Sequence, residues 1–300
     1  MAMTALKEGD DLIVLPSGSK VLYRDSLHRY WMMIEPLEEI EPGRKVETVP
    51  LVGVTTVTGC LDKPALLPWV EAQTCAALFE PGEAGVALAE RMPTDAEALA
   101  KALRRAQLGW RYTRDAAASR GTSVHAALTE LAEQGTIPRL SNFPAEDQGY
   151  VRGLIRFWLD AAPEVEACEM VVASERLCMA GRFDLLWRNS EPRELCVNAE
   201  TGEAATFEPG LRLTDAKTAK GVYPTENFTQ LEGYEVLRVE SGYEPTDERL
   251  VLRLDEGGPY EVARSTATAE DFLAVRQVYE MDKRLKASRP RPKKREAVAA

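Results

Sequence analysis

Two short segments place acidic and basic side chains where they can act on one anion. Asp215 and Lys217 stand two residues apart in a predicted strand over 211–218, and Asp184 lies in an earlier predicted strand over 182–188. Because side chains alternate along a strand, Asp215 and Lys217 would share one face, about 7 Å apart between Cα atoms. The carboxylates can hold Mg²⁺ or Mn²⁺ while the ammonium stabilises developing charge on a phosphate. The spacing suits phosphodiester chemistry but does not establish it, because a D-x-K triplet alone is more often an exposed ion pair.

Three further residues carry groups that suit such a site. His125 is one of two histidines and follows Val124 in an apolar helical pattern, where a packed or capping histidine is the usual alternative to a metal ligand. Gln230 and Tyr234 are four residues apart, so a helix would put an amide and a phenol on one face. We expect them to hydrogen-bond phosphate or to position the active-site strand. The alternative is a surface glutamine above a half-buried tyrosine.

Composition restricts how the chain could meet nucleic acid. The 300 residues carry 37 Lys and Arg against 48 Asp and Glu, a net charge of -11, so the mean surface field repels DNA and binding needs a local basic site. Five arginines interleaved with Trp110 and Tyr112 are candidates for that site, unless they form only a solvated helix face. They are Arg104, Arg105, Arg111, Arg114 and Arg120. Residues 283–300 are predicted to be a basic disordered tail that tethers nucleic acid or merely aids solubility.

Sequence signals for other classes of protein are missing. The five cysteines form no C-x-x-C, which favours a reducing compartment, and no apolar run reaches the roughly 18 residues of a membrane span. We therefore expect a cytoplasmic protein with no membrane partner. The chain also lacks a G-x-x-x-x-G-K-[ST] phosphate loop, a G-x-G-x-x-G after a strand and a G-x-S-x-G elbow, which argues against nucleotide motors, dinucleotide enzymes and serine hydrolases.

The elements that must position these residues follow from periodicity and turn signals. Residues 10–60 are typical of β structure, including a run over 49–57, and residues 65–132 are rich in helix formers. The remaining helices are predicted over 145–162, 225–239 and 267–285. The remaining strands are predicted over 166–176, 182–188, 211–218, 250–254 and 260–262, with a tight turn at Gly181 and a polar hairpin loop before Leu211. This order predicts an α/β (α+β) fold with a β-rich extension (1–64), a core with a helical insert (65–282) and the basic tail (283–300).

Four motifs occur in an order that resembles the RecB-like branch of the PD-(D/E)XK nuclease superfamily. G-x-x-x-H, G-x-x-D, D-x-K-T and Q-x-x-x-Y match residues 121–125, 181–184, 215–218 and 230–234. The resemblance implies a restriction-endonuclease-like core, a mixed central sheet flanked by helices. It also implies that Lys217 is catalytic. The metal ligands it implies are His125, Asp184, Asp215 and the backbone oxygen of Ala216. Glu175 matches an acid often found upstream of G-x-x-D in that family, a structural salt bridge being the equal alternative.

A softer N-terminal match, which includes His28, extends the resemblance to phage-encoded members of that branch. Relatives with an iron–sulfur cluster carry three cysteines after the core, whereas none here follows Cys196, so we expect no cluster. The resemblance implies a Mg²⁺- or Mn²⁺-dependent deoxyribonuclease, favouring an exonuclease of phage-type recombination, replication or DNA processing, in the host cytoplasm if phage-encoded. Its partners would be single- or double-stranded DNA and a single-strand annealing or other recombination protein. The alternatives are a catalytically silent nuclease-fold binding or assembly protein and a structure-specific endonuclease; polarity and oligomeric state are not indicated.

Overall fold

The computed structural model describes residues 2–34, 37–61, 63, 66–79, 96–106 and 108–288. The strands are β1 (Ala2–Ala5), β2 (Asp10–Val14), β3 (Lys20–Arg24), β4 (Arg29–Met33), β5 (Lys45–Gly53), β6 (Glu164–Ser174), β7 (Met179–Asn189), β8 (Arg193–Asn198), β9 (Glu203–Phe207), β10 (Gly210–Lys217), β11 (Glu248–Leu254) and β12 (Tyr260–Arg264). The helices are α1 (Val54–Thr58), α2 (Leu66–Phe79), α4 (Ala96–Arg105), α5 (Trp110–Gln134), α6 (Gln148–Ala161), α7 (Pro224–Glu240) and α8 (Ala269–Ser288), with 3₁₀ turns η1 (Asp25–Leu27) and η2 (Leu140–Asn142).

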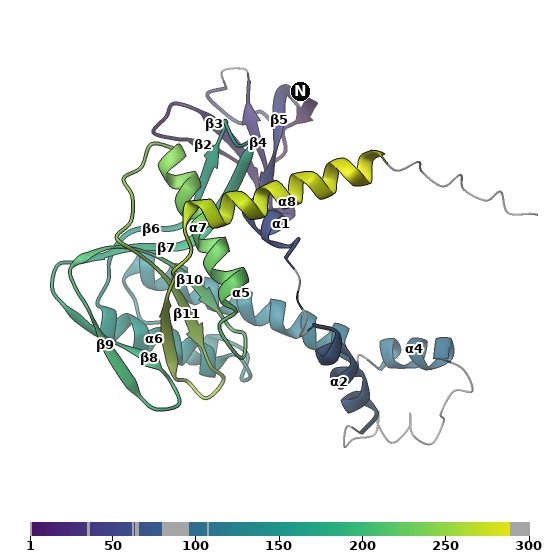
Figure 1. The fold of residues 1–300 in the computed structure, drawn as a ribbon, viewed down its shortest axis with the longest axis vertical. Coiled ribbons are helices and arrows are strands. Elements are labelled where there is room, and N and C mark those ends of the chain that lie inside the picture. Colours follow the sequence, from purple (N-terminus) through teal and green to yellow (C-terminus); the bar gives the residue numbers. More distant parts are fainter. Residues whose placement is uncertain are drawn as a thin grey trace, which may run out of the picture.

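Ten of these described strands form one mixed sheet, and helices pack on both of its faces (Figure 1). Its main order is β12-β11-β10-β7-β5-β4-β3-β2, with β6 paired to β7 and β1 paired to β5. The pairs β10–β11 and β5–β7 are parallel, and the other pairs are antiparallel. The predicted α/β core with a mixed central sheet flanked by helices is therefore confirmed.

Strand β11 shows how the sheet divides the core. Leu250, Leu252 and Leu254 pack with α5 and α6 on one face, whereas Val251 packs with α1, α7 and α8 on the other. This is the period-two alternation expected of a strand buried on both faces. The two helix layers hold β7 and β10 between them, and these are the strands that carry the acidic motifs.

Two predicted boundaries are wrong, and packing explains both. The β-prone run over 49–57 is a strand only to Gly53, because α1 begins at Val54 and buries Val54 and Val57 against the core. Gly181 lies inside β7 rather than in a turn, and the turn is formed by residues 175–178. A Cβ at Gly181 would lie 2.7 Å from Tyr234 Cε1, so glycine permits the close approach of α7 to β7.

The structure also differs from the sequence prediction in two polar segments. The segment expected as a polar loop before Leu211 contains β8 and β9, which form a separate two-stranded sheet beside β12. Helix α8 continues to Ser288, so residues 283–288 of the predicted disordered tail are helical, and residues 289–300 lie outside the described residues. None of the described helices combines the length and apolar character needed to cross a membrane.

Candidate active site

The site lies where the sheet forks along one edge of β7. Strand β6 covers the other edge, while β5 pairs with Met179 and Ala180 and β10 pairs with residues 185–189. Between these two partners, residues 181–184 have no strand neighbour on that edge among the described residues. A cavity of about 260 Å³ opens at this gap, and Gly181, Arg182 and Asp184 line it. The fork therefore exposes part of a central strand to a hollow that a ligand can enter.

Three carboxylates from three neighbouring strands face this cavity. The register of β6 on β7 puts Glu169 opposite Asp184, because the residues on either side of both are paired. On the other side of β7, Asp215 comes one position after the last β7–β10 pair, Thr214 with Leu185, and so also stands beside Asp184. Like charges in adjacent cross-strand positions repel one another. A row of this kind favours a bound cation.

Glu169 is the acid that the sequence did not single out, and its backbone is unusual. Its φ of +50° is in the left-handed region, which residues other than glycine rarely adopt and which is often found at functional positions. One carboxylate oxygen accepts from Nδ1 of His125 at 2.6 Å, and the other lies 3.0 Å from Nε of Arg182. Strand β6 contains Glu164, Glu166 and Glu169, and only the strand register shows which of these three acids lies beside Asp184.

Burial and mutual charge shift the proton equilibria of this group. Asp184 is only 6 % exposed, and burial followed by the negative charge of Asp215 raises the pKa of Asp184 to about 7. The hydrogen bond to Glu169 outweighs the opposing effect of burial, and with the Asp184 charge it raises the pKa of His125 to about 9. Burial is thus the main cause of the pKa shift of Asp184, whereas neighbouring carboxylates cause the pKa shift of His125.

The group also has the composition of a metal site. One ligand atom each from His125, Glu169 and Asp184 all lie within 4.8 Å of one another. Carboxylate oxygens with one imidazole nitrogen fit Mg²⁺ or Mn²⁺, which prefer oxygen but accept a nitrogen ligand in the case of Mn²⁺. A cation bound here would reduce the repulsion between Asp184 and Asp215. The donor set therefore fits a divalent ion such as Mg²⁺ or Mn²⁺.

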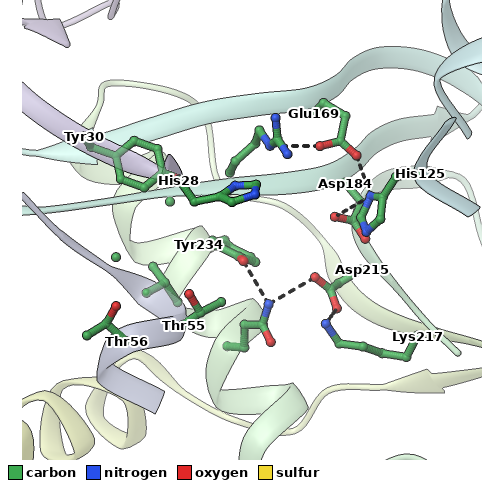
Figure 2. Close-up of a pocket in the computed structure, with 15 residues that line it drawn as sticks. His28, Tyr30, Thr55, Thr56, His125, Glu169, Asp184, Asp215, Lys217 and Tyr234 are labelled. Atoms are coloured by element: carbon green, nitrogen blue, oxygen red, sulfur yellow. Dashed lines mark hydrogen bonds and ion pairs between the residues drawn. The ribbon is translucent and has the colours of Figure 1, made fainter. Parts of the chain in front are cut away.

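Asp215 lines the same cavity but points to other partners (Figure 2). It is 2 % exposed, its Oδ2 forms an ion pair with the Lys217 ammonium, and its Oδ1 accepts from Gln230 Nε2 at 3.3 Å. Gln230 also donates to Tyr234 Oη at 2.8 Å. Burial lowers the pKa of Lys217, but Asp215 and Asp184 outweigh this and leave it raised, so the side chain stays cationic.

These contacts distinguish between interpretations that the sequence left open. The D-x-K pair is not an exposed ion pair, because Asp215 is buried, and Gln230 and Tyr234 are 7 % and 4 % exposed rather than on the surface. The backbone amide of Ala216 donates to Asp184 Oδ2 at 2.7 Å and the residue is not among those that line the cavity, so the role of its carbonyl oxygen as a ligand stays a prediction. Asp215 lies outside the three-residue donor group, and its Oδ2 is paired with Lys217 of the same strand.

Glu175 and the five arginines do not join the site. Glu175 lies in the exposed turn between β6 and β7, away from the cavity lining. None of the arginines lines the cavity either, although all of them are described. Arg111 and Arg114 lie over the Trp110 ring at 5.0 and 5.5 Å, and Arg120 lies 4.6 Å from the centre of the Tyr150 ring. Their predicted contact with DNA stays a prediction about α4 and α5.

The N-terminal part of the chain supplies a wall of the cavity that the sequence motifs did not include. His28 and Tyr30 come from the β3–β4 connection and β4, and Thr55 and Thr56 come from α1. The sequence predicted strands here but no register, and the pairing of β5 with β7 brings this wall to the acids. The sequence held part of this signal, because His28 is one of only two histidines and lies in the softer N-terminal match. Both histidines line this cavity.

No model of a known protein family matches the chain, and no curated protein sequence matches it significantly.

Proposed function

We propose that this protein is a metal-dependent deoxyribonuclease that hydrolyses phosphodiester bonds in the cavity at the β5–β10 fork. One observation carries the proposal: carboxylates from β6, β7 and β10 converge with the Lys217 ammonium on one cavity. Two of the four motifs that resemble the RecB-like branch of the PD-(D/E)XK superfamily supply Asp184, Asp215 and Lys217, whereas Glu169 lies outside all four. That resemblance favours an exonuclease of phage-type recombination, replication or DNA processing, with DNA as substrate and a single-strand annealing or other recombination protein as partner.

His125, Glu169 and Asp184 would hold Mg²⁺ or Mn²⁺ in this proposal. When bound, the ion neutralises phosphate oxygens and lowers the pKa of water. Lys217 then provides a fixed positive charge beside the phosphate, because the charges of Asp215 and Asp184 outweigh the effect of burial and keep it protonated. Asp215 orients that ammonium, and the Gln230–Tyr234 pair fixes Asp215 in turn.

The first prediction tests the role of the D-x-K pair. Lys217→Ala and Asp215→Asn should each reduce cleavage at least ~100-fold, the size expected when a preorganised charge is lost. The assay digests end-labelled linear and circular DNA, single- and double-stranded, in Mg²⁺, Mn²⁺ or EDTA. Near-normal activity of either variant, with the fold intact by circular dichroism, would contradict the assignment.

The same assay separates the proposal from its alternatives. Loss of linear DNA with circles left intact indicates an exonuclease, whereas nicked or linearised circles indicate an endonuclease. DNA that is retarded in a gel but never cut, with either ion, indicates a binding or assembly protein. Cleavage that persists in EDTA would remove the metal from the proposal.

A further inference from the structure

The wall formed by residues 28–56 differs chemically from the acidic wall that faces it. All three carboxylates of the described lining, Glu169, Asp184 and Asp215, come from β6, β7 and β10. The N-terminal wall contributes no acid to that lining; it offers the imidazole of His28, the phenol of Tyr30 and two threonine hydroxyls. The cavity is therefore divided into one side that suits a cation and another that offers hydrogen-bond donors.

The conformation of His28 directs its ring into the cavity. The residue ends η1 with a φ of +46°, in the left-handed region, and its N–H donates to the Asp25 carbonyl at 3.0 Å. Figure 2 shows the imidazole extending toward Asp184 and His125. Nδ1 lies 3.4 Å from Tyr23 Oη, and Nε2 has no hydrogen-bond partner among the described residues. An exposed ring held in a rare backbone conformation beside the acids is available to a ligand.

Thr55 and Thr56 place two neighbouring hydroxyls on the same wall. Both side chains are exposed, and neither hydroxyl hydrogen-bonds another described residue. A Cβ added to Gly53 would lie 3.5 Å from Thr56 Oγ1 and 3.8 Å from Thr55 Oγ1, so both hydroxyls border the bare backbone of Gly53. Glycine there leaves open the space that a side chain would fill.

We propose that His28, Thr55 and Thr56 form a subsite for the DNA phosphate adjacent to the one that is cleaved, an inference that rests on the proposed function. Imidazole N–H groups and hydroxyls are common donors to phosphate oxygens. The acidic wall repels phosphate except where a cation is held. One phosphate therefore lies at the cation, and its neighbour lies at the N-terminal wall. Arg182 stands between the walls, where Asp25 and Glu169 hold it in place at 2.9 and 3.0 Å.

The chain allows a direct binding test because it has only two histidines. Their imidazole C–H signals in proton NMR are assigned with His28→Asn, a change that keeps the left-handed backbone because asparagine tolerates it. Thymidine 5′-monophosphate, titrated into the Mg²⁺-loaded protein, should shift the His28 signal, and thymidine without phosphate should not. A His28 signal unmoved by the nucleotide, or moved equally by both compounds, overturns the subsite.

Affinity measurements use a matched control from another turn. Cys178 is also exposed with a φ of +51° and lies outside the cavity lining, so Cys178→Asn repeats the same change of residue type at a distance. His28→Asn and Thr55→Val should weaken nucleotide binding about 10-fold each, as expected for loss of one hydrogen bond to a charged group. Cys178→Asn should bind as the unaltered protein does. Equal affinity in all four proteins overturns the proposal.

Cleavage kinetics identify the source of the phosphate. The substrates are one oligonucleotide with a 5′-phosphate, the same sequence with a 5′-hydroxyl, and a single-stranded circle. If the subsite takes a terminal phosphate, the unaltered protein prefers the phosphorylated end and His28→Asn loses that preference. If it takes an internal phosphate, His28→Asn raises KM for every substrate about 10-fold with a smaller change in kcat. Unchanged KM and end preference contradict both forms.

The two proposals fail separately in these experiments. An unaltered protein that binds the nucleotide through His28 but never cleaves DNA disproves the nuclease function and retains the phosphate subsite. An unaltered protein that cleaves DNA, with His28→Asn and Thr55→Val behaving identically to it, disproves the subsite and retains the nuclease.

Discussion

The buried carboxyl of Asp184 lowers the stability of the metal-free fold at neutral pH. The carboxyl is buried beside Asp215, and its pKa rises from 3.8 when unfolded to about 7 when folded. The folded chain therefore binds this proton more tightly, and the contribution of Asp184 to stability falls as the pH rises from about 4 to about 7. Sites that bind cations often carry such a cost, which the ion removes.

Asp184→Asn should therefore stabilise the metal-free protein. The amide oxygen can still accept from the Ala216 amide, while the buried negative charge is gone. We expect a gain on the order of 1 kcal/mol at pH 7 that shrinks at pH 5. Urea unfolding in EDTA at both pH values measures it. His125, whose raised pKa gives stability that is present below pH 6.5 and lost through about pH 9, titrates mostly outside this window. A variant less stable than the parent at pH 7 would contradict this account.

Glu169 and Glu175 provide a matched pair for the metal. Glu169 contacts His125 and Arg182 at the cavity, whereas Glu175 lies in an exposed turn. Glu169→Gln should lower the affinity for Mn²⁺ at least ~10-fold, because it removes a charged ligand. Glu175→Gln should leave that affinity unchanged. The increase in melting temperature on titration with Mn²⁺ measures both, and a larger effect of Glu175→Gln would move the acid back to the position that the family resemblance implied.

Two glycines of the sequence motifs have different roles in the packing of helices and strands. Gly181 of β7 allows α7 to pack closely, since an added Cβ would lie 2.7 Å from Tyr234 Cε1 and 3.0 Å from Val54 Cγ2. Gly121 of α5 has no atom within 4 Å of such a Cβ. The first glycine therefore sets the distance between β7 and α7, on which the Tyr234–Gln230–Asp215 hydrogen bonds depend.

Alanine at each position separates these roles. Gly181→Ala should destabilise the protein by roughly 1–3 kcal/mol through overpacking and should lower activity by displacing Tyr234. Gly121→Ala should stabilise it by about 0.5–1 kcal/mol, because alanine favours a helix interior. Urea unfolding of both variants gives the comparison. A tolerated Gly181→Ala would show that β7 and α7 have room to separate.

The sequence predicted the elements that carry the site better than it predicted their register. Period-two and helical patterns placed Asp184, Asp215 and Gln230 on the right kinds of element, because those patterns depend on local burial. Glu169 was missed because its position beside Asp184 depends on the β6–β7 register, which shifts at a bulge between Val165 and Ala167.

The N-terminal strands belong to the same sheet as the strands that carry the acidic residues. The sequence predicted an extension over 1–64, yet β5 pairs with β7 in the central sheet. Tyr23 and Met32 of the N-terminal strands also share a buried cluster with Val171 and Ala173 of β6. Non-local contacts of this kind join the N-terminal wall of the cavity to the acidic wall. The cavity exists only while both regions are folded.

This continuity predicts one cooperative unfolding transition. Trp31 of β4 reports on the N-terminal strands and Trp187 of β7 reports on the central sheet. In two variants, each retaining one of these tryptophans and with the others replaced by phenylalanine, fluorescence should give the same urea midpoint, because neither region loses its packing alone. Far-UV circular dichroism of each variant checks that the replacements leave the fold intact. A lower urea midpoint at Trp31 would mean that the N-terminal strands unfold independently. The N-terminal wall would then be a movable part of the site rather than a fixed one.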